Sequence, residues 1–371
     1  MQGRGSTTSI YWCIRNTRRP PPFRACAPIC APLRPASRML VRSIPKRRTL
    51  ARLVRASRGA GLVVATLLFV PVALGQDAAA WLQRAAGAAR SLNYVGTIVY
   101  QHGSRVETSR LVHLFDANGE FEKLTNLDGP AREVVRNNDQ VRCYYPDAKV
   151  VRIEPRSFRN AFPSLLPQQL SALATYYFFR KAEIARIAGL ETQAFVFEPK
   201  DGLRYGHKFW ADLTSGLLLK ARLLNEKNEA VEQFAFTDIQ IGARLEREMI
   251  RPPFIFLPPD WQVRESPPGE VTPEETGWMV RDLPPGFAKV VEGFRVLRGK
   301  PAPVAHLVFS DGLVAVSVFI EPTPSSPQPV GLSQQGGINV YSRQLDDHLV
   351  TVLGEAPGAT VRQIAYSVGH R

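Results

Sequence analysis

The chain has little cysteine, and its four cysteines are unevenly placed. Cys13, Cys26 and Cys30 precede residue 39, and only Cys143 lies further along. One thiol cannot form an internal disulfide, so the body of the protein has no disulfide framework. Cys143 occupies the strand-like stretch 140–144 and is interpreted as a core or sheet residue. A reactive or intermolecular thiol is the alternative.

Acidic residues are missing from residues 1–76, although that segment holds 14 of the 47 Lys and Arg. The other 33 basic residues are matched by 33 Asp and Glu from Asp77 onward. The formal net charge of +14 therefore belongs to the N-terminal segment. A nearly neutral remainder predicts no nucleic-acid partner.

An apolar run long enough to span a membrane is also lacking. The run 59–74 contains Pro71 and is shorter than the roughly 20 residues that a spanning helix needs. It follows a basic stretch and ends in small residues, a pattern typical of a bacterial export signal cleaved between Gly75 and Gln76. An uncleaved anchor is the alternative. Both interpretations place the rest of the chain outside the cytoplasm, and cleavage predicts a periplasmic protein.

Four segments are expected along the chain. Residues 1–75 form a leader and signal peptide, of which the Arg- and Pro-rich 1–38 are interpreted as non-native sequence before a start at Met39. Residues 76–246 form a large domain and 278–371 a small one. The linker between them, 247–277, is crowded with proline, which neither a helix nor a central strand tolerates.

Alternating apolar and polar residues predict a mostly β (α+β) fold with meandering antiparallel strands in both domains. A helix capped by Asp77, with Trp81 on its apolar face, is expected first. A second helix is expected after Pro167, with Leu173 and Tyr177 on one face. A third is expected to close the chain over 357–368.

Catalytic motifs are absent. No nucleophile elbow, zinc-binding His-Glu pair or P-loop occurs in the expected mature chain, and the six histidines are scattered singly. Asp346, Asp347 and His348 are adjacent, so their side chains point apart and are interpreted as solvated loop charge. No catalytic residue, metal site or cofactor is therefore expected. A hydrolase built from distant residues is left open.

The large domain has an excess of apolar and aromatic residues on its long strands, including Trp210. A sheet that curls without closing beneath a helix would leave an apolar concave face suited to acyl chains. A plain hydrophobic core explains the same residues equally well. The lipid-binding candidates are Tyr94, Ile98, Tyr100, Leu111, Phe115, Phe195, Phe197, Phe209, Leu217 and Leu219.

Several longer stretches resemble the periplasmic sigma-E regulatory protein family of the RseB/MucB type. In the first domain these are Asn93–Tyr100, Asp201–Lys220 and Glu232–Thr237; in the second they are Leu283–Phe287, His306–Leu313, Val316–Phe319 and Thr360–Ala365. They occur in order over nearly the whole expected mature chain. The element from Trp210 to Gly216 is also shared with lipoprotein carriers, so the small domain is what distinguishes the regulator.

This resemblance implies a large domain like the open β-barrel of outer-membrane lipoprotein carriers, with covering helices, joined to a small antiparallel β domain. It implies a negative regulator that binds the periplasmic segment of a membrane anti-sigma factor, shields it from proteolysis, and is released by a lipid or lipoprotein signal. The partner-binding candidates in the small domain are Phe309, Asp311, Phe319 and Tyr341. A periplasmic lipid or lipoprotein carrier is the alternative function, and a homo-oligomer is left open.

Overall fold

The computed structural model describes residues 73–138, 140–155, 162–167, 172–254, 256–265, 275–295, 297, 302–323, 329–335 and 337–371. Apart from residues 73–75, the expected leader lies outside the described residues, and so does Met39. No helix among the described residues is long and apolar enough to cross a membrane.

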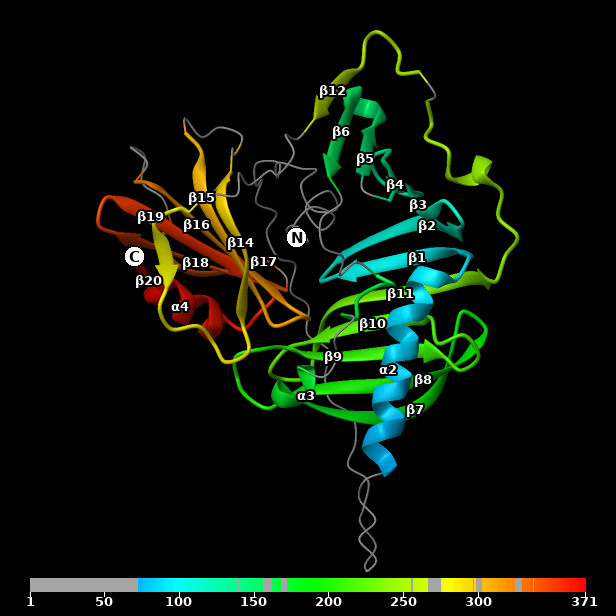
Figure 1. Ribbon diagram of the computed structural model, residues 1–371, viewed down its shortest axis with the longest axis horizontal. Coiled ribbons are helices and arrows are strands. Elements are labelled where there is room, and N and C mark those ends of the chain that lie inside the picture. Colours follow the sequence, from blue (N-terminus) through cyan, green and yellow to red (C-terminus); the bar gives the residue numbers. More distant parts are fainter. Residues whose placement is uncertain are drawn as a thin grey trace, which may run out of the picture. The chain divides into compact units, whose positions relative to one another are not determined.

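The first part of the chain forms one large sheet (Figure 1). Its strands are β1 (Tyr94–His102), β2 (Arg105–Asp116), β3 (Gly119–Asn126), β4 (Glu133–Asn137), β5 (Gln140–Tyr145), β6 (Val150–Pro155), β7 (Tyr177–Ile187), β8 (Leu190–Pro199), β9 (Gly206–Asp212), β10 (Leu218–Leu224), β11 (Ala230–Ile241) and β12 (Gln262–Glu265). They lie in the order β12-β6-β5-β4-β3-β2-β1-β11-β10-β9-β8-β7. Two antiparallel meanders are thus joined side by side where β1 pairs with β11.

Helix α2 (Ala73–Ser91) runs across strands β7 to β11 in Figure 1. It begins four residues before Asp77, so the expectation that Asp77 caps this helix is wrong. Ala85 and Ala89 are 1% exposed and pack in one cluster with Phe195 and Phe209 of the sheet. Small side chains on this helical face let the helix approach the aromatic rings closely. We call this α2-covered side of β7–β11 the inner face.

The expected second helix lies partly outside the described residues, which omit 168–171. Among the described residues of this stretch there is one helical turn, α3 (Leu173–Tyr176), and Tyr177 is the first residue of β7. Tyr177 pairs with Pro199 across the β7–β8 ladder, and this strand pairing overrides the helical spacing of its neighbours. Leu173 and Tyr177 are nevertheless both buried, as their apolar character predicts.

The rest of the chain forms a smaller β domain. A six-stranded sheet has the order β14-β15-β16-β19-β18-β17, and β13 (Trp278–Val280) pairs with β20 (Val368–His370). The six strands are β14 (Ala288–Arg295), β15 (Val304–Ser310), β16 (Ala315–Pro322), β17 (Gly331–Gln335), β18 (Ile338–Leu345) and β19 (His348–Gly354). Helix α4 (Gly358–Ser367) buries Val361, Ile364 and Ala365 against this sheet, as the sequence predicted.

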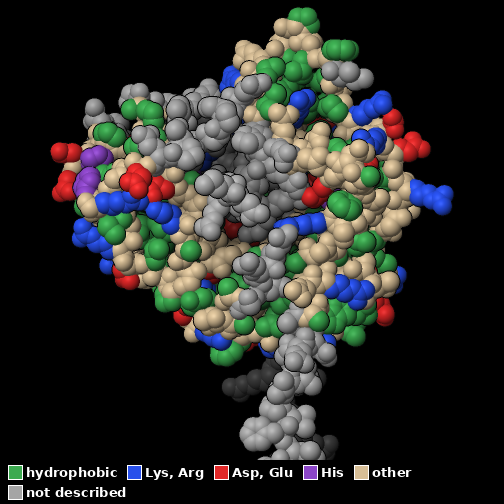
Figure 2. Space-filling view, viewed as in Figure 1, with side chains coloured by type: hydrophobic (Ala, Val, Ile, Leu, Met, Phe, Trp, Pro, Cys, Tyr) green, Lys and Arg blue, Asp and Glu red, His purple; other side chains and the backbone are tan. Residues whose placement is uncertain are grey.

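The Pro-rich stretch between the two sheets is not entirely free of regular structure. The stretch contains a short 3₁₀-helical turn, η2 (Arg247–Ile250). Another such turn, η1 (Pro146–Ala148), lies between β5 and β6 of the large sheet. Strand β12 pairs in parallel with β6 at the edge of the large sheet, a position that needs a partner on one side only. In Figure 2 hydrophobic side chains show at this end of the sheet. Part of the expected linker therefore belongs to the large sheet.

Cys143 is a core residue, as the sequence predicted. Its side chain is fully buried on β5, between Val134 and Val141. A thiol in this position fills space between strands and has no access to solvent.

Candidate functional site

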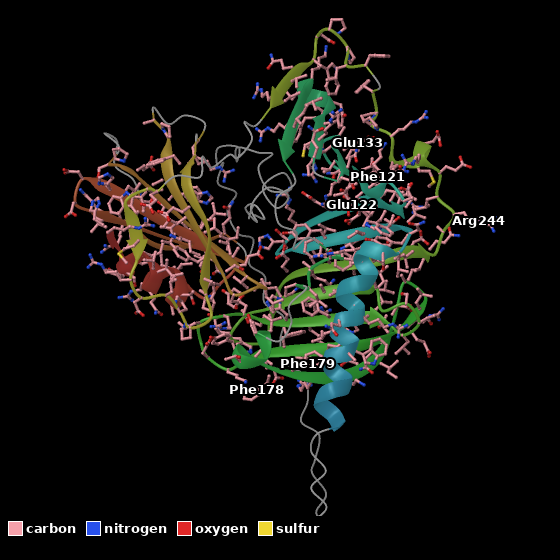
Figure 3. All side chains as sticks on the ribbon, viewed as in Figure 1. Phe121, Glu122, Glu133, Phe178, Phe179 and Arg244 are labelled. Carbon is pink, nitrogen blue, oxygen red and sulfur yellow. The ribbon has the colours of Figure 1, made fainter. Side chains whose placement is uncertain are left out.

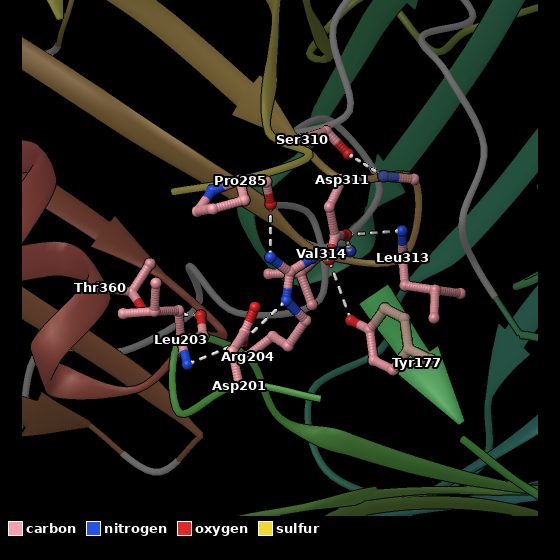
Figure 4. A network of polar contacts seen from close by, with 11 residues as sticks. Tyr177, Asp201, Leu203, Arg204, Pro285, Ser310, Asp311, Leu313, Val314 and Thr360 are labelled. Atoms are coloured by element: carbon pink, nitrogen blue, oxygen red, sulfur yellow. Dashed lines mark hydrogen bonds and ion pairs between the residues drawn. The ribbon is translucent and has the colours of Figure 1, made fainter. Parts of the chain in front are cut away.

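A buried ion pair joins the two domains (Figure 4). Arg204, in the loop between β8 and β9, donates from Nη1 to Oδ2 of Asp311, 3.0 Å away, in the turn between β15 and β16. Both side chains are fully buried. Arg204 also donates from Nη2 to the carbonyl of Pro285 at 2.5 Å and from Nε to Asp201 at 3.1 Å. Each of the three guanidinium nitrogens therefore donates to an acceptor, and a buried cation needs such partners.

Tyr177 completes this group from the start of β7. Its hydroxyl donates to Oδ2 of Asp311 at 2.9 Å, while Oδ1 of Asp311 accepts the backbone N–H groups of Leu313 and Val314. Burial, together with the Asp311 carboxylate, raises the pKa of Tyr177 well above its ordinary value. The hydroxyl thus stays protonated and acts as a donor. We call Tyr177, Arg204 and Asp311 the interdomain lock.

Further hydrogen bonds between described residues cross between the domains. Thr360 of α4 donates to the carbonyl of Leu203 at 2.6 Å, and Asn339 of β18 donates to the hydroxyl of Tyr205 at 2.9 Å. The backbone N–H of Gly337 donates to Nε2 of His102 at 2.6 Å. The loop 200–205 therefore holds the small domain through three consecutive residues, Leu203, Arg204 and Tyr205.

Close packing supports these polar contacts. The ring of Tyr176 lies over Gly286, where a Cβ atom would come within 2.3 Å of the ring. The guanidinium of Arg204 stacks on the same ring, with 4.7 Å between Cζ and the ring centroid. Gly286 has φ +84°, a conformation that favours glycine for a second reason.

Most of the lipid-binding candidates converge on the inner face or beside it. Tyr94, Ile98, Leu111, Phe195, Phe197, Phe209, Leu217 and Leu219 belong to the cluster beneath α2. Tyr100 is buried next to this cluster, against Phe234. Phe115 is 46% exposed and does not join them. All the candidates in the cluster are buried, with at most 6% of each side chain exposed.

Two neighbouring aromatic residues of β7 lie on opposite sides of the large sheet. Phe178 and Phe179 are consecutive on this strand (Figure 3) and point to opposite faces. Phe179 stacks on Phe195 with 5.6 Å between ring centroids and so extends the inner face. Phe178 is 60% exposed.

The partner-binding candidates do not form one surface. Phe309 is 2% exposed in the core of the small domain, and Asp311 is committed to the interdomain lock. Phe319 is half-buried and stacks on His306, with 4.3 Å between ring centroids. Tyr341 is half-buried and bonds the exposed Tyr366. Their contact with a partner stays a prediction.

The comparisons with known proteins agree with this two-domain architecture. Residues 77–254 match the model of the MucB/RseB N-terminal domain, and residues 272–369 match that of the MucB/RseB C-terminal domain. The chain belongs to the MucB/RseB family.

Relatives of this MucB/RseB family member match most of its length and almost all of their own. The sigma factor AlgU regulatory protein MucB of Pseudomonas aeruginosa is 32% identical over 83% of this chain and 95% of its own. The sigma-E factor regulatory protein RseB of Escherichia coli is 29% identical over 83% and 95%. A crystal structure of MucB in complex with MucA(peri) is 31% identical, with a TM-score of 0.65 over 80% of this chain and 99% of that one.

The way this MucB/RseB chain joins its domains was not predicted from its sequence. Asp311 was a candidate site residue, but Arg204 and Tyr177, which lie 107 and 134 residues away along the chain, were not. One signal was available: Asp201–Lys220 and His306–Leu313, two of the stretches that carry the family resemblance, each contain one member of the buried ion pair.

Two of the histidines are buried and uncharged. His207 and His306 are buried, which lowers the pKa of His207 to about 4 and that of His306 to about 3. Both are therefore neutral at neutral pH. Among the described residues no three His, Cys, Asp or Glu side chains are grouped so as to hold a metal ion.

Proposed function

We propose that this chain regulates an envelope-stress sigma factor by binding the periplasmic segment of a membrane anti-sigma factor. The observation that carries the proposal is the similarity to MucB, which has been crystallised in complex with MucA(peri) and which this chain matches over 99% of the MucB chain. A match over both domains supports a function that needs both. The chain would work in the periplasm, where the anti-sigma segment lies, and catalysis has no part in the proposal.

In this proposal the bound chain shields the anti-sigma segment from the protease that starts its destruction. A lipid or lipoprotein signal then releases it. Release requires that the lipid bind the partner-free state more tightly, and a coupling of about 1 to 3 kcal/mol changes partner affinity about 5- to 150-fold.

The inner face is the proposed lipid site. Its side chains are already buried beneath α2, so an acyl chain has to take the place of packed groups such as Leu82 and Ala85. We infer that this displacement is transmitted to the interdomain lock through β7, because Phe179 of the inner face and Tyr177 of the lock lie on that strand. Phe309, Asp311, Phe319 and Tyr341 remain the proposed partner contacts of the small domain.

The test is binding of the chain from Gln76 to Arg371 to the periplasmic segment of its cognate anti-sigma factor, measured by calorimetry with and without a lipopeptide. The proposal predicts saturable binding that weakens by at least about fivefold when lipopeptide is added. An unrelated acidic peptide of the same length is the control. Lack of binding to the anti-sigma segment would refute the regulatory function.

A periplasmic lipid or lipoprotein carrier is the second candidate. The continuous apolar inner face with a covering helix favours it. The same calorimetry separates the two functions, because a carrier takes up lipopeptide saturably but does not bind the anti-sigma segment.

A further inference from the structure

Three cations surround one tryptophan on the side of the sheet opposite the inner face. Trp210 of β9 lies opposite Lys220 of β10, and Lys208 lies opposite Arg222. The centroid of the Trp210 ring is 5.0 Å from Nζ of Lys208, 5.1 Å from Nζ of Lys220 and 5.5 Å from Cζ of Arg222. Trp210 does not belong to the cluster beneath α2, although it is only 4% exposed. The stems of the three cationic side chains help to cover its ring.

The nearby acidic charge does not balance this cluster. Lys208 pairs with Glu183 at 2.8 Å, and Arg222 donates from Nε to the amide oxygen of Gln233 at 2.6 Å. Lys220 has no hydrogen bond or ion pair within the part of the chain that the structure describes; directly across from it on β11 lies Ala235. Burial and the like charges of Arg222 and Lys208 lower the pKa of Lys220. Within the described residues, only Lys208 of the three cations has an ion pair with a carboxylate.

Such an arrangement costs energy in the absence of an anion. Like charges on neighbouring strands destabilise a sheet, and the attraction of each cation to the ring offsets only part of this repulsion. Covering Trp210 does not require positive charge, since any long side chain could do it. The three charges converge above a single ring, a geometry that suits one compact, multiply charged anion better than an extended acidic chain.

We propose that Lys208, Lys220 and Arg222 form a binding site for a phosphate group on the outer side of β9 and β10. Arg222 offers the guanidinium donors that Gln233 does not use, and Lys220 offers an ammonium with all its donors available. The phosphate is either a free anion or the headgroup of a phosphorylated lipid. The site is separate from the inner face and does not depend on the regulatory function proposed above.

The test uses two probes on the chain from Gln76 to Arg371: inorganic phosphate by calorimetry, and flotation with phosphatidylcholine vesicles that do or do not contain phosphatidic acid. We expect binding to one or both phosphate probes. Lys220→Gln should weaken it about tenfold, because a charge-assisted hydrogen bond is lost. Binding to free phosphate assigns the site to a soluble anion, and binding only to phosphatidic acid vesicles assigns it to a lipid headgroup.

The matched control is Lys227→Gln, which removes the same charge from the exposed turn between β10 and β11. It should leave phosphate binding unchanged. Equal weakening by Lys227→Gln and Lys220→Gln would overturn the site, and so would absence of binding to either probe. Tighter binding of a polyglutamate peptide than of phosphate would also overturn it. The far-UV circular dichroism spectrum shows whether each variant is folded. Binding of the anti-sigma segment, measured in parallel, shows whether the regulatory function stands independently.

Discussion

Among single residues, Arg204 is a fully buried cation whose charge is stabilised by its hydrogen-bond partners inside the protein. Arg204→Met should lower the free energy of unfolding by about 3 to 5 kcal/mol, because Asp311 would remain buried without its counter-ion. Arg180→Met is the control: Arg180 pairs with Glu198 at 2.7 Å, but both side chains are about half exposed, and loss of such a pair costs at most about 1 kcal/mol. Urea denaturation measures both. Similar losses in the two variants would contradict the importance of the buried pair.

The buried His306 is expected to make the stability of the protein depend on pH. Its pKa is about 3 in the folded chain and near 6.5 when unfolded, so between these values the unfolded state binds a proton that the folded state does not. Stability from this residue is therefore complete above pH 6.5 and is lost as the pH falls toward 3. His306→Phe should reduce this loss by an amount on the order of 4 kcal/mol. Denaturation over this pH range measures it, and a pH profile that is the same in His306→Phe as in the unaltered chain would contradict the prediction.

The environment of a residue could be predicted from the sequence where its neighbours in the structure are also close to it along the chain. The burial of Cys143 follows from the alternation within its own strand. The contacts of Arg204 do not, because its partners Asp311 and Pro285 belong to another domain. An arginine in a polar loop is ordinarily exposed, and only the tertiary structure shows that this one is buried.

Among the structural elements, the loop before β14 needs a glycine at position 286, where the backbone packs against the ring of Tyr176 in the large domain. Gly286→Ala introduces a Cβ atom into the ring of Tyr176 and places alanine at positive φ. Gly277→Ala is the matched control, since its φ is +76° and no atom lies within 4 Å of its Cβ position. The control should cost only about 1 to 2 kcal/mol of backbone strain. Gly286→Ala should cost more, as measured by thermal unfolding, and equal costs would show that the Tyr176 contact is unimportant.

Elements were predictable wherever the local pattern and the final pairing agree. The hairpins of the large sheet follow from alternation and turn residues, and α4 lies where its apolar spacing places it. The two disagree at Tyr177: the local spacing predicted a helix there, but pairing with Pro199 makes it a strand residue. The junction of β1 with β11 was not foreseeable either, since it joins residues about 140 positions apart.

At the scale of the whole molecule, the interdomain lock and the inner face should be coupled if a lipid releases the partner by changing how the domains dock. Arg204→Met then imitates the lipid. We expect it to weaken binding of the anti-sigma segment by about 5- to 150-fold, and added lipopeptide should weaken it little further. Arg180→Met should bind the segment and respond to lipopeptide like the unaltered chain. Calorimetry of the three chains, with and without lipopeptide, measures the coupling. A full lipid response in Arg204→Met would mean that release leaves the lock intact, and the inner face would then have to act on the partner directly.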